Sequence, residues 1–119
     1  MRMWMVNPKR LCRKHLLGEH VEIHMLVGTL KKGHSIDGFL EKGLVDPRHV
    51  EPRHDAIARE MVARGYHHGS PLDGPDLILS THLLGTDNNP GNWVDVQESI
   101  RELKNRCAEC SSNLTLQTG

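Results

Sequence analysis

Three polar side chains, His15, Glu19 and Glu22, have the spacing at which residues share one face of an α-helix. At about 100° per residue they fall within one narrow arc. That arc borders an apolar stripe, and Gly18 leaves room beside it for a molecule to approach. A carboxylate at the edge of a core is partly desolvated, which raises its pKa toward values useful for proton transfer. The face is a candidate acid–base site, although polar residues beside a core more often bind a loop or an arginine.

A second group of residues has metal-ligand spacing. Cys107 and Cys110 form a CxxC pair, and Cys12 with His15 forms a CxxH pair. Together they offer three thiolates and one imidazole, a ligand set typical of structural zinc sites. Such a site would lock the third expected helix onto the first, and free thiols packed between helices are the alternative interpretation. We expect no cofactor other than this structural zinc.

A further histidine pair, His20 and His24, is one helical turn apart and is expected on the opposite, polar face. The segment HVEIH differs from the zinc-protease pattern, in which the glutamate directly follows the first histidine. We therefore do not expect metal catalysis from this pair.

Three helices would position these residues. The first is predicted from Pro8 to Lys31, because Asn7 can cap its first turn, Pro8 suits the first helical position and Gly33 is a stop signal. Its apolar stripe consists of Leu16, Ile23, Val27 and Leu30.

The rest of the chain adds two more helices and long loops. The second helix is predicted over about residues 52–64 and the third over about 94–107. Between them, residues 66–92 are rich in glycine and proline and are predicted to be mostly loop, with a segment LILSTHLL that the pattern does not assign. Residues 111–119 are predicted to be a flexible tail. The fold class is therefore all-α: one compact domain over residues 1–119, of about three helices with long irregular loops.

Composition narrows the class of protein. The chain has 119 residues, 37% hydrophobic and 25% charged, which is typical of a single globular domain. No apolar run approaches the roughly 20 residues that span a bilayer, and the segment MRMWMVNP lacks the features of a signal peptide. We expect a cytoplasmic monomer without a membrane partner. The first 34 residues carry seven Lys and Arg against two Glu, which is compatible with a polyanionic ligand and also with a charge dipole that binds nothing.

The start of the chain offers a nucleophile. Because Arg2 is large, we expect the initiator Met1 to be retained, so that its α-amine is the terminus. An α-amine has a pKa of about 7.7–8.0 and is partly neutral at pH 7, unlike a lysine. Beside a carboxylate, such an amine can form a Schiff base at a sugar or carbonyl carbon.

Four segments together resemble a known family. They are MRMW at the terminus, HLLGEHVE at 15–22, VGTLKKG at 27–33 and RHDAIAREMVARGY at 53–66. In these segments the chain resembles the pyrimidine dimer DNA glycosylases of the endonuclease V type, found in phage and bacteria. The resemblance covers over half of the chain and implies a compact, mainly three-helix fold.

The resemblance implies a DNA-repair glycosylase and abasic-site (AP) lyase. By this match the catalytic residues are Met1, as the amine nucleophile, and Glu22. Arg2, His15 and Glu19 are expected to bind the substrate, and Lys14 is a further candidate for holding the DNA backbone. The expected partner is double-stranded DNA that contains a lesion, such as a pyrimidine dimer, or an abasic site.

The alternative function is a non-catalytic module on the same scaffold. It would bind DNA or another partner, with or without zinc at Cys12, Cys107 and Cys110.

Overall fold

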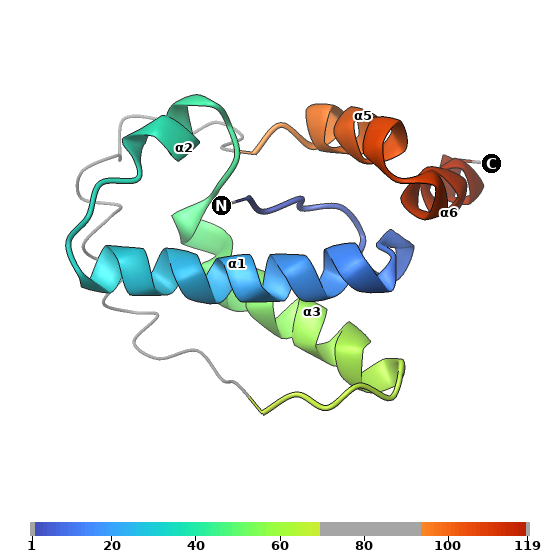
Figure 1. Cartoon of the computed structure of the whole chain (residues 1–119), viewed down its shortest axis with the longest axis horizontal. Coiled ribbons are helices and arrows are strands. Elements are labelled where there is room, and N and C mark those ends of the chain that lie inside the picture. The colour runs from blue at the N-terminus through green and yellow to red at the C-terminus, as the bar shows by residue number, and fades with distance from the viewer. Residues whose placement is uncertain (1, 70–93, 119) are drawn as a thin grey trace.

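The computed structural model describes residues 2–69 and 94–118, which form helices and loops without any strand (Figure 1). The all-α prediction is confirmed. In chain order the elements are η1 (Pro8–Arg10), α1 (Arg13–Lys31), α2 (Asp37–Glu41), η2 (Pro47–His49), α3 (Val50–Ala63), α5 (Val96–Arg106) and α6 (Ala108–Thr118), where η denotes a 3-10 turn. None of these helices is long and apolar enough to cross a membrane. The unassigned segment LILSTHLL lies outside the described residues.

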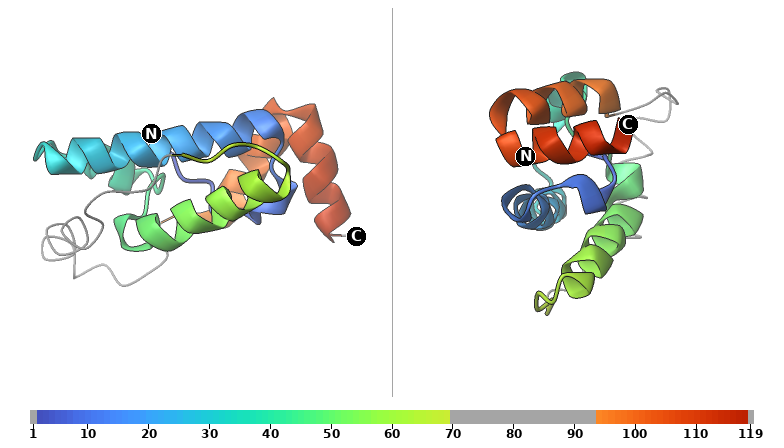
Figure 2. Two further views of the ribbon diagram at one scale, coloured as in Figure 1. Left: turned by 90° about the horizontal axis from the view of Figure 1, so that it is seen from below. Right: turned by 90° about the vertical axis from the view of Figure 1, so that its right-hand side faces the viewer.

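Two helical layers enclose a middle layer that consists of α1 and the extended segment before it (Figures 1 and 2). Helix α3 packs on one side of α1 and also contacts η1 and η2. Helices α5 and α6 pack against each other on the other side, where α6 contacts η1. The N-terminal segment therefore lies between α1 and the C-terminal helices.

Helix α1 starts later than predicted. Asn7 and Pro8 do cap and begin a helical turn, but that turn is η1. Leu11 then adopts an extended conformation (φ −78°, ψ 141°), and α1 begins at Arg13 with Cys12 as its cap. The predicted stop is confirmed, because Gly33 has a φ of 74°, which favours glycine. The apolar stripe is buried at Leu16, Ile23 and Val27, and Leu30 packs against it.

The N-terminal segment is fixed by the core and by hydrogen bonds from both sides. Met3, Trp4 and Val6 are buried. The Met3 N–H donates to the carbonyl of Leu44 (2.7 Å), and the Arg53 guanidinium donates to the carbonyl of Val6 (2.6 Å). The backbone beside the chain terminus is therefore held by residues far away in the sequence.

The C-terminal part differs from the prediction of a flexible tail. Helix α6 covers Ala108–Thr118, and its Cys110 and Leu114 are buried in the core. The sequence did not predict this helix, because the short polar segment SSNLTLQTG gives only a weak amphipathic pattern, and the helix packs against α5 and η1. The other two predicted helices are confirmed as α3 and α5, with ends shifted by one or two residues.

Candidate active site

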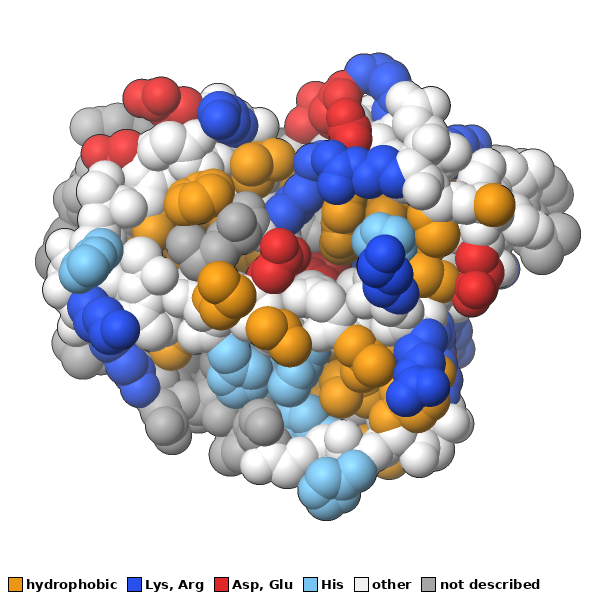
Figure 3. Space-filling view, viewed as in Figure 1, with side chains coloured by type: hydrophobic (Ala, Val, Ile, Leu, Met, Phe, Trp, Pro, Cys, Tyr) orange, Lys and Arg blue, Asp and Glu red, His pale blue; other side chains and the backbone are white. Residues whose placement is uncertain are grey.

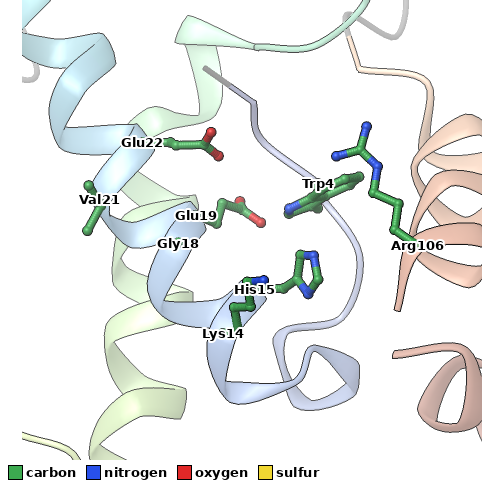
Figure 4. A pocket seen from close by; sticks show the side chains of 8 residues that line it. All are labelled: Trp4, Lys14, His15, Gly18, Glu19, Val21, Glu22 and Arg106. Atoms are coloured by element: carbon green, nitrogen blue, oxygen red, sulfur yellow. The ribbon is translucent and has the colours of Figure 1, made fainter. Parts of the chain in front are cut away.

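A hollow of about 440 Å³ lies on the face between α1 and the end of α5. Figure 3 shows it with Lys and Arg side chains along one edge and acidic side chains inside it. The side chains that line it, drawn in Figure 4, are those of Trp4, Lys14, His15, Glu19, Val21, Glu22 and Arg106, together with the backbone at Gly18. Its volume is that of an ordinary small-ligand pocket.

The predicted face of α1 forms one wall of this hollow. His15, Glu19 and Glu22 all line it, as their helical spacing predicted. A Cβ built at Gly18 meets no atom within 4 Å, so the glycine leaves open space in the middle of the wall. The sequence-based interpretation of Gly18 as room for a ligand agrees with this geometry.

Glu19 is fully buried in an ion pair. Its two carboxylate oxygens accept from the Nε and NH2 groups of Arg53, at 2.6 and 2.9 Å. The same guanidinium donates its NH1 group to the Val6 carbonyl. The pair therefore links α1 and α3 to the N-terminal segment. A bidentate arginine–carboxylate contact of this kind fixes the relative orientation of the two side chains. Sequence reasoning placed Glu19 on the right face but did not identify Arg53 as its partner.

Glu22 lies one helical turn further along and is only partly buried. Burial raises the pKa of its carboxyl group above the ordinary value, and the negative charge of Glu19 adds to this effect. The backbone N–H and the charge of Arg2 act in the opposite direction and lower it. Because these effects on its pKa oppose each other, the Glu22 carboxyl group can exchange protons with a molecule in the hollow.

Among the described residues, Lys14 and Arg106 line the hollow, and Arg2 lies against its lining residue Trp4. The Arg2 guanidinium lies over the Trp4 ring at 4.1 Å from its centroid, and Arg106 approaches the same ring at 5.7 Å. Burial, with the nearby Arg106 charge, lowers the pKa of Arg2. Lys14 is exposed at the rim. This edge of the hollow can bind a polyanion.

Arg106 is a charged lining residue that sequence reasoning missed. It comes from the last turn of α5, more than 80 positions along the chain from the other lining residues, and its side chain extends toward Trp4 (Figure 4). The only signal in the sequence was that Arg106 directly precedes Cys107, a member of the predicted metal-ligand set.

The predicted cysteine and histidine ligands lie together beside the hollow. The ligand atoms of Cys12, His15, Cys107 and Cys110 are all within 4.8 Å of one another. The Cys12 sulfur is 3.1 Å from Nδ1 of His15 and 3.8 Å from the Cys107 sulfur, and the Cys110 sulfur is 3.6 Å from Nδ1 of His15. Tetrahedral zinc with ordinary bond lengths separates two sulfurs by about 3.8 Å and a sulfur and a nitrogen by about 3.6 Å. The cluster, formed by residues of α1, α5 and α6 and their caps, can hold a metal ion.

Backbone N–H groups also point at these sulfurs. The Cys12 N–H donates to Cys110 (3.3 Å), the Cys110 N–H to Cys107 (3.4 Å) and the His15 N–H to Cys12 (3.4 Å). Hydrogen bonds of this kind favour a thiolate and lower the pKa of Cys107, whereas burial raises the pKa of Cys110 to about 12. Burial also lowers the pKa of His15, which keeps its imidazole in the neutral form that binds metals.

His20 and His24 do not lie on a polar surface as predicted. His20 is buried, and the rings of His24, His54 and His68 surround it at centroid distances of 4.8–5.1 Å. The prediction was wrong because α3 and the segment after it cover this side of α1, and neither packing partner can be read from the helix itself.

Comparison with known proteins agrees with the resemblance seen in the sequence. The family model described as pyrimidine dimer DNA glycosylase matches residues 1–73, more than half of the chain. These residues carry the N-terminal segment, α1 and α3, and so, within the described part of the chain, the lining of the hollow apart from Arg106. No curated protein and no solved structure matches the chain. On the family match, the chain belongs to the pyrimidine dimer DNA glycosylase family.

Proposed function

We propose that this chain is a DNA glycosylase and AP lyase that uses the α-amine of Met1 as its nucleophile and Glu22 as its acid–base group. The observation that carries the proposal is the partly buried Glu22 carboxyl group beside the backbone N–H of Arg2. Three covalent bonds separate the Met1 nitrogen from the Arg2 nitrogen, so the two atoms are within about 4 Å of each other in any conformation. We therefore propose that the α-amine of Met1 acts together with the Glu22 carboxylate.

The proposed reaction begins with a nucleotide turned out of the duplex into the hollow. The neutral amine attacks C1′, the bond from C1′ to the base breaks, and the base leaves with the bonding electrons and takes up a proton. Loss of the amine protons and opening of the sugar ring give an imine between Met1 and C1′. Removal of a proton from C2′ then expels the 3′ phosphate by β-elimination, and water hydrolyses the imine. Glu22 stabilises the cationic sugar and takes part in the proton transfers.

The cations at the edge of the hollow are proposed to hold the DNA backbone. Arg2, Lys14 and Arg106 border the space that the nucleotide enters. Turning a nucleotide out costs a few kcal/mol, and contacts to the flanking phosphates can offset part of that cost. The substrate class is duplex DNA with a pyrimidine dimer or an abasic site.

Glu19 and His15 are proposed as positioning residues rather than ligands of the substrate. Both oxygens of Glu19 bind Arg53, which in turn binds the Val6 carbonyl, so Glu19 acts on the N-terminal segment through Arg53. His15 faces the Cys12 and Cys110 sulfurs.

We assign the cysteine cluster a structural zinc ion, bound by Cys12, His15, Cys107 and Cys110. The distances among their ligand atoms support this assignment. Zinc there would fasten α5 and α6 to the start of α1 and so keep Arg106 above the hollow. Metal analysis of the purified chain, with Cys107→Ser as the zinc-deficient variant, tests it.

Borohydride trapping on abasic-site DNA tests the chemistry. The native chain should give a covalent adduct whose peptide mass locates the DNA on Met1, and intact mass spectrometry should show that Met1 is retained. An N-terminal extension should abolish the adduct. Glu22→Gln should slow base release and strand cleavage at least tenfold while DNA binding persists, whereas Glu51→Gln, at an exposed position of α3, should behave as the native chain does.

Two results would overturn the proposal. An adduct that survives the N-terminal extension would place the nucleophile elsewhere. DNA binding without any adduct on pyrimidine-dimer or abasic DNA would favour the non-catalytic DNA-binding module.

A further inference from the structure

A cluster of imidazoles lies beside the hollow, where Figure 3 shows histidine side chains gathered on the same face. His20 comes from α1, His54 from α3 and His68 from the segment after α3. Their metal-binding atoms all lie within 4.8 Å of one another, and His20 and His54 are buried. Three chain segments thus direct one imidazole each to a common point.

The geometry of the cluster is that of a ligand set. Nε2 of His68 and Nε2 of His20 are 3.0 Å apart. Two imidazole nitrogens on one tetrahedral zinc ion are separated by about 3.4 Å, so a shift of a few tenths of an ångström suffices. Nδ1 of His54 contacts Oδ1 of Asp55 at 3.1 Å. A carboxylate on the second ring nitrogen is the usual support of a metal-bound histidine, because it fixes the ring and the tautomer.

We propose that His20, His54 and His68 form a binding site for a divalent transition-metal ion of the zinc class. This site is separate from the cysteine cluster and does not depend on the proposed DNA chemistry. The bound ion would fasten α1, α3 and the segment after α3 to one another.

The donor set decides which ions fit. Imidazole nitrogens suit Zn²⁺, Co²⁺, Ni²⁺ and Cu²⁺, whereas Mg²⁺ and Ca²⁺ need oxygen ligands. Burial lowers the pKa of His20 to about 4, so this imidazole is neutral near pH 7, as a ligand must be. An open depression beside the cluster is lined by His20, Val21, His24 and Met25. A water molecule from this depression can supply the fourth ligand.

The test counts metal ions in the full chain, freed of any affinity tag. Apo protein is titrated with Zn²⁺, and the native chain should bind two equivalents. Cys107→Ser should lose one equivalent and His68→Gln the other. His67→Gln is the matched control, because His67 is the exposed neighbour of His68 and does not belong to the cluster. Titration with Co²⁺ separates the two sites, since only the cysteine cluster gives a sulfur-to-metal charge-transfer band.

The competing interpretation is that the imidazoles only pack together and share the His68–His20 hydrogen bond. One zinc equivalent in the native chain, unchanged in His68→Gln, would overturn the proposal. If His68→Gln does not fold, the imidazole ¹⁵N resonances of the native chain decide. If the ¹⁵N resonances of His20, His54 and His68 shift when the second equivalent of zinc is added, the site is supported. If they do not shift, the site is rejected.

Discussion

Replacing Glu19 by glutamine tests the ion pair that fixes the N-terminal segment. Glutamine has nearly the same shape, but it removes the negative charge that faces the Arg53 guanidinium. Arg53 is only 7% exposed, so its charge would be left buried with a single amide oxygen and the Val6 carbonyl as acceptors. The substitution should therefore act on stability first.

The size of the effect follows from burial. Removing one partner of a buried ion pair costs about 3–5 kcal/mol, and the acceptor that glutamine retains favours the lower end of this range. With an unfolding entropy of about 2.1 cal/mol/K per residue, 119 residues give about 0.25 kcal/mol/K. A loss of about 3 kcal/mol then lowers the Tm by about 12 °C. The loss of about 3 kcal/mol is a large part of the free energy of unfolding of such a domain, which is roughly 5–15 kcal/mol.

Urea and thermal unfolding, followed by circular dichroism, measure this loss. Glu102→Gln is the matched control, because the Glu102–Arg106 pair at 2.9 Å is largely exposed and should contribute less than about 1 kcal/mol. The double variant Glu19→Gln, Arg53→Met removes both buried charges and should recover much of the lost stability. A loss at Glu19 no larger than that at Glu102 would refute the reasoning that this pair holds the segment in place.

Three further predictions concern the hollow and its edge. The Gly18→Ala variant should fold normally and gain up to about 1 kcal/mol of stability, because the new Cβ meets no atom within 4 Å. The Gly18→Leu variant should also fold, but its side chain should fill the hollow and slow adduct formation more than tenfold. Unfolding curves and adduct kinetics measure these two effects. Arg106→Gln should weaken binding to duplex DNA and reduce the dependence of log K on log salt by about one, as fluorescence anisotropy over a salt series would show. Cys107→Ser should lower the free energy of unfolding by about 4 kcal/mol relative to the native chain, with zinc at 1,000 times the Kd of the cysteine cluster, and equal stability of the two chains at that zinc concentration would reject the structural ion.

The sequence by itself determined the helical wall of the site. Helical spacing alone puts His15, Glu19 and Glu22 on one face and Gly18 between them, because side-chain direction in a helix depends only on position along the chain. Glycines at 33 and 65 ended α1 and α3 for an equally local reason, since each adopts a positive φ. Ligand spacing also predicted each half of the cysteine cluster, since a CxxC and a CxxH pair each need only one turn to bring their side chains together, whereas the meeting of the two pairs, 95 positions apart, depends on the tertiary structure.

Other features of the site arise between elements, and no local pattern encodes them. Arg53 lies 34 positions from Glu19, and nothing in the helix that carries either residue identifies the other. The burial of His20 likewise depends on α3 and the segment after it. Their histidines pack against His20, so the face that was expected to be polar carries an imidazole cluster.

The C-terminal part is the clearest example of a conformation that the local sequence does not encode. The sequence after residue 110 has little amphipathic pattern, yet Leu114 is buried and α6 is a helix, because packing supplies the stability that short isolated helices lack. That packing also brings Arg106 to the hollow from the far end of the chain. Local spacing determined which residues share a helix face, and only the tertiary structure decided which faces meet, since contacts between distant segments depend on how the whole core is filled.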